Sequence, residues 1–285
     1  MTGPKRVAAI HDISGVGRCS LTVIIPVLST MGVQVCPVPT AVLSAHTGYG
    51  EFVMRDLTDF IPAALDNYKR MGTEFDCIYS GFLASTEQID HCLKFFSSYP
   101  SALKVVDPVM GDNGENYKTY TPELCRRMSE LAAVADIITP NLTEAAILLG
   151  ERFPEGTVDH SVMRSWLVRL SQQGPRIVVI TSVPVAGSGI CTVGYDREKN
   201  SFWKVSGEYV PISYSGSGDM FTSILIGGLL GGDSLPIAMN RAAAFTQSAV
   251  KTTYSYGTPW TDGIMFEPLL HRLRSDRELN DYTNL

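Results

Sequence analysis

An α/β fold with a mostly parallel sheet, covered by helices on both faces, is the architecture that this sequence predicts. The first observation is that short apolar runs alternate with longer helical segments up to Ser182. The second is that these runs are apolar throughout, which is typical of parallel strands buried on both faces. The third is the repeating order of strand and helix, which is that of an open sheet wrapped by helices.

Predicted helices lie between the predicted strands in this part of the chain. The strands are expected at 6–10, 33–38, 76–82, 103–107, 136–140 and 176–182. The helices are expected near 20–31, 56–71, 86–98, 122–134, 142–149 and 159–173.

Beyond Ser182 the pattern of alternating strands and helices ends. Residues 189–210 predict two or three antiparallel strands around a turn at 196–200. A small and apolar helix is expected after Gly218, with further helices near 234–253 and 264–274. No boundary has the composition of a linker, so we expect a single domain over residues 1–285.

The composition limits the classes of partner. With 45% hydrophobic and 18% charged residues the chain can bury a substantial core, and its net charge of −6 argues against a general nucleic-acid binder. No segment resembles the apolar part of a signal peptide, and no apolar run is long enough to span a bilayer. The 6 cysteines are scattered, without a CxxC pair, so we expect them to be reduced and zinc binding to be absent. We therefore expect a cytoplasmic protein without nucleic-acid or membrane partners.

Polar residues and glycines gather in the segments that follow the predicted strands. In open α/β sheets, ligands bind beyond the carboxyl ends of the strands. Familiar nucleotide motifs do not explain these segments, because the chain has no Gly-Lys pair for a P-loop and Ser20 replaces the third glycine of a dinucleotide fingerprint. We therefore expect a ligand site of another type, built from the segments 11–17, 44–50, 107–114, 139–145 and 181–183.

A single carboxylate stands at the start of the small and apolar helix, in the sequence Gly216-Ser217-Gly218-Asp219. Backbone N–H groups at a helix N-terminus carry partial positive charge, and glycines let a phosphate approach them closely. An acid beside such a site can accept the proton of a hydroxyl that attacks the phosphate. The alternative is that Asp219 only complements the helix dipole, which contributes ~0.3–1 kcal/mol. The apolar helix places the carboxylate near the core and favours phosphoryl transfer.

Together with other motifs, this segment resembles a known family. GSGD before an apolar helix, with TPNLTEA upstream, is similar to the ribokinase-type small-molecule kinases. HTGYG (46–50), DPVMGD (107–112) and ITPNLTEA (138–145) narrow the resemblance to the pyridoxal kinases. The motifs have the family's order and spacing between Asp12 and Asp219. The resemblance implies a three-layer ribokinase-like fold.

The resemblance also implies roles for the residues that carry the phosphate chemistry. Asp219 would be the base, and Gly216, Ser217 and Gly218 would form the anion hole. Asn141 and Glu144 would hold Mg²⁺ largely through waters, although the same pair could equally form a helix capping box. Asp107 and Asp112 would lie near the phosphates and cations, with turn capping as the alternative. The expected nucleotide contacts are Asp107, Asp112, Thr139, Asn141, Thr181 and Ser182.

On the substrate side the chain departs from the pyridoxal kinases. Asp12 stands where those enzymes commonly have Ser and is closer to the hydroxymethylpyrimidine kinases, while Phe82 replaces a frequent Tyr. An ionised Asp12 would favour a ring that presents a hydrogen-bond donor, unless it only caps the following turn. Many members also have Thr in place of Ser217. The expected substrate contacts are Asp12, Ser14, His46, Thr47, Tyr49 and Phe82.

The leading expectation is ATP-dependent phosphorylation of the 5′-hydroxymethyl group of pyridoxal, pyridoxine or pyridoxamine, giving the 5′-phosphate and ADP. The alternatives are a hydroxymethylpyrimidine kinase of thiamin synthesis, a dual-specificity enzyme, or a non-catalytic protein that binds the vitamer. Asp219 and its glycines are present, which disfavours the non-catalytic alternative. A sugar kinase is disfavoured because no early run of Asp, Asn and Gly is found. The resemblance implies a homodimer and leaves the need for a monovalent cation open.

Overall fold

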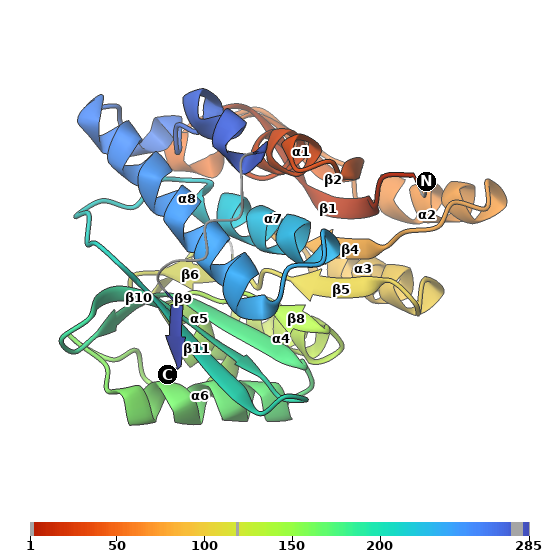
Figure 1. Ribbon diagram of the computed structural model, residues 1–285. Coiled ribbons are helices and arrows are strands. Elements are labelled where there is room, and N and C mark those ends of the chain that lie inside the picture. Colours follow the sequence, from red (N-terminus) through yellow and green to blue (C-terminus); the bar gives the residue numbers. More distant parts are fainter. Residues whose placement is uncertain (1–2, 118–119, 275–281, 285) are drawn as a thin grey trace.

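The computed structural model describes residues 3–117, 120–274 and 282–284, and its centre is one large mixed sheet (Figure 1). The strands of this sheet are β1 (Arg6–Val16), β2 (Gln34–Ala45), β3 (Met54–Asp56), β4 (Cys77–Ser80), β5 (Leu103–Val106), β8 (Ile137–Ile138), β9 (Ile177–Val185), β10 (Gly189–Asp196), β11 (Ser201–Gly207) and β12 (Tyr282–Asn284). A separate small hairpin is formed by β6 (Gly111–Asp112) and β7 (Glu115–Asn116).

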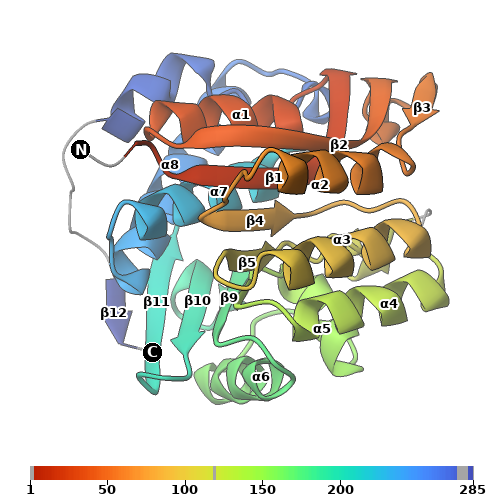
Figure 2. The same ribbon diagram turned by 90° about the vertical axis from the view of Figure 1, so that its right-hand side faces the viewer.

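The order of the strands is β12-β11-β10-β9-β8-β5-β4-β1-β2-β3, and Figure 2 shows the sheet extending from β3 at one end to β12 at the other. The pairs from β2 through β1, β4, β5 and β8 to β9 are all parallel. Antiparallel strands extend both ends of this parallel centre. The predicted mostly parallel α/β sheet and the antiparallel strands after residue 189 are confirmed, whereas β3 and the β6–β7 hairpin were not predicted.

Helices cover both faces of the sheet, as predicted. One layer contains α2 to α6 and the other contains α1, α7, α8 and the C-terminal 3-10 helix η3. The helices are α1 (Leu21–Thr30), α2 (Phe60–Arg70), α3 (Thr86–Ser98), α4 (Pro122–Ala133), α5 (Leu142–Leu149), α6 (His160–Gln172), α7 (Ser217–Leu230), α8 (Leu235–Ser255), η1 (Thr47–Tyr49), η2 (Trp260–Asp262) and η3 (Glu267–Arg274).

Strand β1 shows why its apolar run does not alternate with polar residues. Val7 and Ala9 pack into the core beneath α1, α7 and α8, whereas Ala8 and Ile10 pack into the core beneath α2 to α6. All four side chains are fully buried. Successive side chains point to opposite faces, so a strand covered on both sides must be apolar at every position.

Several element boundaries differ from the prediction, among them the end of β2, which continues from the predicted Val38 to Ala45. Strand β1 continues from the predicted end at Ile10 to Val16, because β2 pairs with it as far as Ala45. Strand β9 likewise continues beyond Ser182 to Val185. The helix expected at 264–274 is a 3-10 helix that begins at Glu267. The extensions of β1 and β9 depend on pairing with β2 and β10, which a local sequence pattern does not show.

Two expectations from composition can be compared with the structure. All 6 cysteines are free, and all but Cys19 and Cys36 are buried. Within the described ranges, no helix combines the length and the apolar character that crossing a membrane requires.

Candidate active site

The predicted site residues come together at one edge of the sheet, where the parallel strands end and α5 and α7 begin. Asp107 follows β5, Asn141 follows β8, and Asp219 lies in the first turn of α7. A Cβ atom added to Gly218 would lie 3.5 Å from a carboxylate oxygen of Asp107. Segments that are more than a hundred residues apart in the chain therefore form one acidic and glycine-rich surface.

The start of α7 depends on a glycine. Gly216 has a φ of +80°, and an added Cβ would lie 2.2 Å from the backbone oxygen of Arg18. Both the left-handed backbone and this close approach exclude a side chain. The N–H of Ser217 donates to the carbonyl of Tyr214 at 3.3 Å, whereas the N–H of Gly218 finds no acceptor in the described part of the chain. The helix N-terminus thus presents N–H groups that can hold an anion.

Asp219 is fixed by a backbone contact and remains partly open to solvent. Its Oδ2 accepts the N–H of Ser20 at 2.7 Å, and its side chain is 15% exposed. Burial raises the pKa of Asp219 to about 6, the negative charge of Asp12 adds to this, and the Ser20 N–H opposes it. A carboxylate with a pKa near neutrality is suited to accept and release a proton at working pH.

Asp12 lies within β1 and supports this arrangement, which corrects its predicted place in a loop. Its Oδ1 accepts the hydroxyl of Ser20 at 2.6 Å, and its Oδ2 accepts the hydroxyl of Ser14 at 3.1 Å. Asp12 is 6% exposed, and burial raises its pKa although both serine hydroxyls lower it. Ser20 therefore links Asp12 to Asp219, through its hydroxyl on one side and its N–H on the other. Sequence patterns gave no signal for Ser20.

The capping box at the start of α5 is present. The Oδ1 of Asn141 accepts the N–H of Glu144 at 2.9 Å, and the Oε2 of Glu144 accepts the N–H of Asn141 at 2.8 Å. The second oxygen of Glu144 accepts the N–H of Met110 at 3.1 Å. The amide of Asn141 also donates to the carbonyl of Gly111 at 2.8 Å, so this side chain is engaged at both ends.

Negative charge accumulates beside the capping box. Burial raises the pKa of Asp107 well above its usual range, and the charges of Glu144 and Asp219 raise it further. Burial also raises the pKa of Glu144, with a contribution from Asp112, against the backbone N–H groups that it accepts. The backbone N–H groups of Asn141, Met110 and Gly111 all interact with the Glu144 carboxylate, which keeps one lone-pair site for a water molecule. These residues fit a Mg²⁺ ion that retains much of its hydration. Among the residues described, no group of three His, Cys, Asp or Glu side chains is arranged to hold a metal directly.

The expected nucleotide contacts Thr139, Thr181 and Ser182 do not lie in open loops after β8 and β9, as the prediction placed them. Thr139 is buried, and its hydroxyl lies 2.9 Å from the hydroxyl of Thr222 on α7. Thr181 and Ser182 lie within β9, which continues to Val185. The pairing register of β9 against β10 shifts at these two residues. Ser182 has a φ of +58°, which is uncommon for a residue other than glycine. This β-bulge turns the Ser182 side chain outward, and bulges often redirect side chains beside functional sites.

The expected ring-binding segment 46–50 is held by the segment 260–262. The Nδ1 of His46 accepts the N–H of Gly48 at 3.1 Å, so its Nε2 carries the proton and donates to the carbonyl of Thr261 at 2.6 Å. The hydroxyl of Tyr49 donates to Asp262 at 2.9 Å. The polar atoms of His46 and Tyr49 are thus hydrogen-bonded to other residues of the protein. Thr47 is exposed.

Phe82 and Ser14, the remaining predicted substrate contacts, and Asp112, a predicted nucleotide contact, differ in burial and in hydrogen bonding. Phe82 is partly buried and meets Tyr120 edge-on, with 5.9 Å between the ring centres. Ser14 is fully buried and bonded to Asp12. Asp112 binds the N–H of Asn113 and accepts the hydroxyl of Ser213 at 3.3 Å, which is compatible with the predicted turn capping.

Residues 17–20 connect the start of α7 with the segments 46–50 and 260–262. A Cβ on Gly17 would lie 2.2 Å from the ring of His46, and a Cβ on Gly263 would lie 2.5 Å from the backbone oxygen of Arg18. The N–H of Arg18 donates to the carbonyl of Asp262 at 3.2 Å. Because Gly216 meets the same Arg18 oxygen, this segment is enclosed by two close approaches to the Arg18 backbone and by the His46 ring at Gly17.

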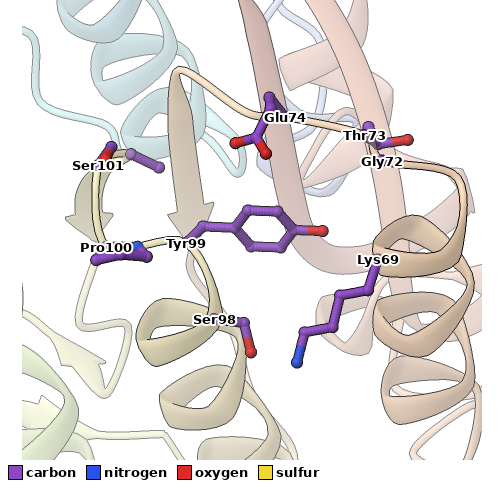
Figure 3. A pocket seen from close by; sticks show the side chains of 9 residues that line it. Lys69, Gly72, Thr73, Glu74, Ser98, Tyr99, Pro100 and Ser101 are labelled. Atoms are coloured by element: carbon purple, nitrogen blue, oxygen red, sulfur yellow. The ribbon is translucent and has the colours of Figure 1, made fainter.

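A hollow of about 360 Å³ lies elsewhere, at the amino ends of β4 and β5 (Figure 3). The ring of Tyr99 projects into it between Lys69 and Glu74. Its lining residues precede the two strands, whereas the candidate site follows them. The hollow is therefore separate from the acidic surface around Asp219. Its lining is Lys69, Gly72, Thr73, Glu74, Ser98, Tyr99, Pro100, Ser101 and Ala102.

Comparison with known proteins gives matches over most of the chain. The family model described as phosphomethylpyrimidine kinase matches residues 25–262. A Bacteroides thetaiotaomicron protein, provisionally named a phosphomethylpyrimidine kinase and crystallised with pyridoxal, is 43% identical, with a TM-score of 0.94 over 99% of this chain and 100% of its own. The pyridoxal kinase of Lactobacillus plantarum is 29% identical, with a TM-score of 0.86 over 94% of this chain and 96% of its own. Pyridoxal kinase PdxY of Proteus mirabilis is 32% identical over 75% of this chain and 77% of its own.

Proposed function

The chain belongs to the phosphomethylpyrimidine kinase family, and from that premise we propose that it uses ATP to phosphorylate the 5′-hydroxymethyl group of a vitamin B6 vitamer. The observation that carries the proposal is Asp219, a base with a pKa of about 6 beside the glycine-rich start of α7. The relative that was crystallised with pyridoxal, at 43% identity, supports the choice of ring.

In the proposed reaction, the vitamer's hydroxymethyl oxygen attacks the γ-phosphorus of ATP. Asp219 accepts the proton of that hydroxyl, and the bond from the γ-phosphorus to the β,γ-bridging oxygen breaks to release ADP. The N–H groups at the start of α7 hold the oxygens of the transferring phosphoryl group. Ser20 keeps the Asp219 carboxylate oriented through its N–H.

Mg²⁺, when bound, would neutralise charge on the β- and γ-phosphates. Glu144 would hold one of its waters through the lone-pair site that the Met110, Asn141 and Gly111 N–H groups leave free. Asn141 would act mainly by orienting Glu144, since its own side chain is engaged at both ends.

A hydroxymethylpyrimidine kinase is the second candidate, because the matching family model carries that description. Asp12 was expected to favour such a ring, but both of its oxygens already accept serine hydroxyls. This engagement weakens the argument from Asp12 and leaves pyridoxal, pyridoxine or pyridoxamine as the favoured substrates.

Initial rates with Mg-ATP and a panel of pyridoxal, pyridoxine, pyridoxamine and hydroxymethylpyrimidine test the proposal. We expect one ADP for each 5′-phosphate formed, with the highest kcat/KM for a B6 vitamer. Higher kcat/KM for the pyrimidine would select the second candidate. Binding of a vitamer without ADP formation would instead favour a non-catalytic binding protein, and Asp219→Ala is the matched inactive control.

We also propose that two copies pair through the β3 end of the sheet. Exposed apolar side chains occur at this end, with Val16 55%, Val42 45%, Val53 77% and Met54 49% exposed. An edge strand with exposed apolar side chains favours association with a second chain. Sedimentation should give a dimer for the parent and a monomer for Val53→Lys/Met54→Lys. A parent that sediments as a monomer at micromolar concentration would contradict this pairing.

A further inference from the structure

The imidazole of His11 is a buried polar group without a hydrogen bond. His11 follows Ile10 in β1 at the carboxyl edge of the sheet, and its side chain is fully buried. Neither ring nitrogen has a hydrogen-bond partner among the residues that the structure describes. Most buried polar side chains are paired, so an unpaired one beside a site calls for an explanation.

The ring is held in one place by its neighbours. A Cβ on Gly81 would lie 2.3 Å from the Cε1 of His11, so the ring fits only because residue 81 has no side chain. The edge of Tyr79 packs against the ring, with 4.3 Å between the ring centres. His11 therefore cannot turn away easily from the direction in which its Nδ1 points.

That direction is towards Asp219. The Nδ1 of His11 lies 3.9 Å from the Oδ1 of Asp219, whereas the other oxygen of this carboxylate accepts the Ser20 N–H. This separation is too long for a hydrogen bond, but a closure of about 1 Å would bring the two atoms within the usual 2.7–3.2 Å range. The Oδ1 of Asp219 is the oxygen that remains for a proton from the substrate.

Resting on the proposed kinase function, we propose that His11 is a positioning residue whose neutral Nδ1–H donates to the Oδ1 of ionised Asp219 and aims the carboxylate at the substrate hydroxyl. Oδ1 keeps a second lone pair for the incoming proton. Burial lowers the pKa of His11 to about 3, so the ring is neutral at working pH and contributes a hydrogen bond without a full charge.

The other groups that face Asp219 make such a donor useful. Asp12 on β1 and Asp107 after β5 are acids that disfavour the ionised form of Asp219 or compete with it for protons. Cys19, Tyr79 and Tyr117 interact with Asp219 and stay neutral, because burial raises their pKa values. Helix α1 has no titratable side chain, and on α8 Arg241 and Lys251 pair with Asp233 and Glu208.

The test compares His11→Phe, which keeps a ring but has no donor, with His11→Asn, which keeps an N–H near the position of Nδ1. The acid limb of the kcat–pH profile reports the pKa of Asp219, since the base must be ionised. In His11→Phe we expect the limb to move up by about one pH unit, since one hydrogen bond to a charged group is lost. His11→Asn should restore most of the parent profile. A uniform loss at all pH values in both variants would show that His11 only packs.

A second measurement does not depend on turnover. NMR titration of ¹³C-labelled aspartate, with Asp219→Asn for assignment, should show the same rise of the Asp219 pKa in His11→Phe. If the parent phosphorylates no substrate of the panel, the proposed function fails, and this titration still decides the role of His11. Should His11→Phe not fold, ¹⁵N spectra of parent histidines decide between the tautomers. A His11 proton on Nε2 alone would overturn the proposal.

Discussion

Two parts of the site use their polar groups differently: the proposed phosphate side, which is the start of α7 with Asp107 and Glu144, and the proposed ring side, which is the segment 46–50 with 260–262. On the phosphate side, the start of α7 presents N–H groups outward, and the buried carboxylates of Glu144 and Asp107 lie near each other. On the ring side, His46 and Tyr49 direct their polar atoms into contacts with Thr261 and Asp262. One side therefore has polar groups available for a charged ligand, whereas the polar groups of the other side mainly form hydrogen bonds within the protein.

This difference has a physical origin. Phosphoryl transfer needs backbone N–H groups and an acid in one helical turn, and a short contiguous motif can provide both. A ring pocket is assembled from side chains of distant segments, and 215 residues separate His46 from Thr261. Variants that perturb each side in turn test whether the two sides are distinct.

The largest effect is expected on the phosphate side, for Asp219→Ala. Loss of the base should lower kcat by ~100- to 10,000-fold while the Kd for ATP stays within a few-fold. Single-turnover rates and nucleotide titrations measure the two quantities. A loss of only a few-fold would mean that Asp219 merely complements the helix dipole.

Gly216→Ala should be the next largest effect. The left-handed backbone costs ~1–2 kcal/mol with a side chain, and the contact with the Arg18 carbonyl adds ~1–3 kcal/mol of overpacking. Gly232→Ala is the matched control, because Gly232 has a φ of +91° with nothing within 4 Å. Urea unfolding should show a larger loss for Gly216→Ala. Equal losses in both variants would remove any special role for the Arg18 contact.

Asp12→Ser tests whether Asp12 serves the phosphate side or the ring side. Because Asp12 holds Ser20 and thereby Asp219, we expect kcat/KM for pyridoxal and for the aminopyrimidine to fall together, by about tenfold for a lost hydrogen bond to a charged group. The ratio of the two constants is the decisive measurement. A ratio that changes by tenfold would place Asp12 in contact with the ring.

Glu144→Gln should raise the Mg²⁺ concentration for half-maximal rate by about tenfold and change the KM of the vitamer less. The amide keeps an acceptor for the capping box but removes the charge that would attract the ion. Initial rates over a Mg²⁺ series give both constants. If the Mg²⁺ dependence is unchanged, the pair serves only as a capping box.

Tyr49→Phe should have the smallest effect, because a partly exposed hydrogen bond contributes ~0.5–1.5 kcal/mol. We expect a few-fold rise in the KM of the vitamer and an unchanged kcat, since the bond to Asp262 only steadies the ring side. Steady-state kinetics with pyridoxal measure both. A fall in kcat as large as that of Asp219→Ala would contradict the division into two sides.

The sequence allowed the α/β fold, the helix after Gly218 and the family to be predicted correctly. Local patterns sufficed there, because strand burial, capping and helix starts depend on neighbouring residues. The extension of β1 through Asp12 and the bulge at Ser182 were not predictable, since they depend on pairing with β2 and β10. Ser20 and His11 were missed for the same reason: their importance comes from Asp219, some 200 residues away in the chain.

The enclosure of residues 17–20 restricts how a lineage of such enzymes can acquire new substrates. The backbone at Gly17, Gly216 and Gly263 leaves no room for a Cβ atom. Substitutions there destabilise the fold, so selection removes them whichever ring is bound. Neutral drift is possible instead at exposed Thr47 and at partly buried Phe82, which carry no such constraint. Directed evolution of ring preference should therefore succeed first at positions 47 and 82, while the join between the two sides is inherited unchanged.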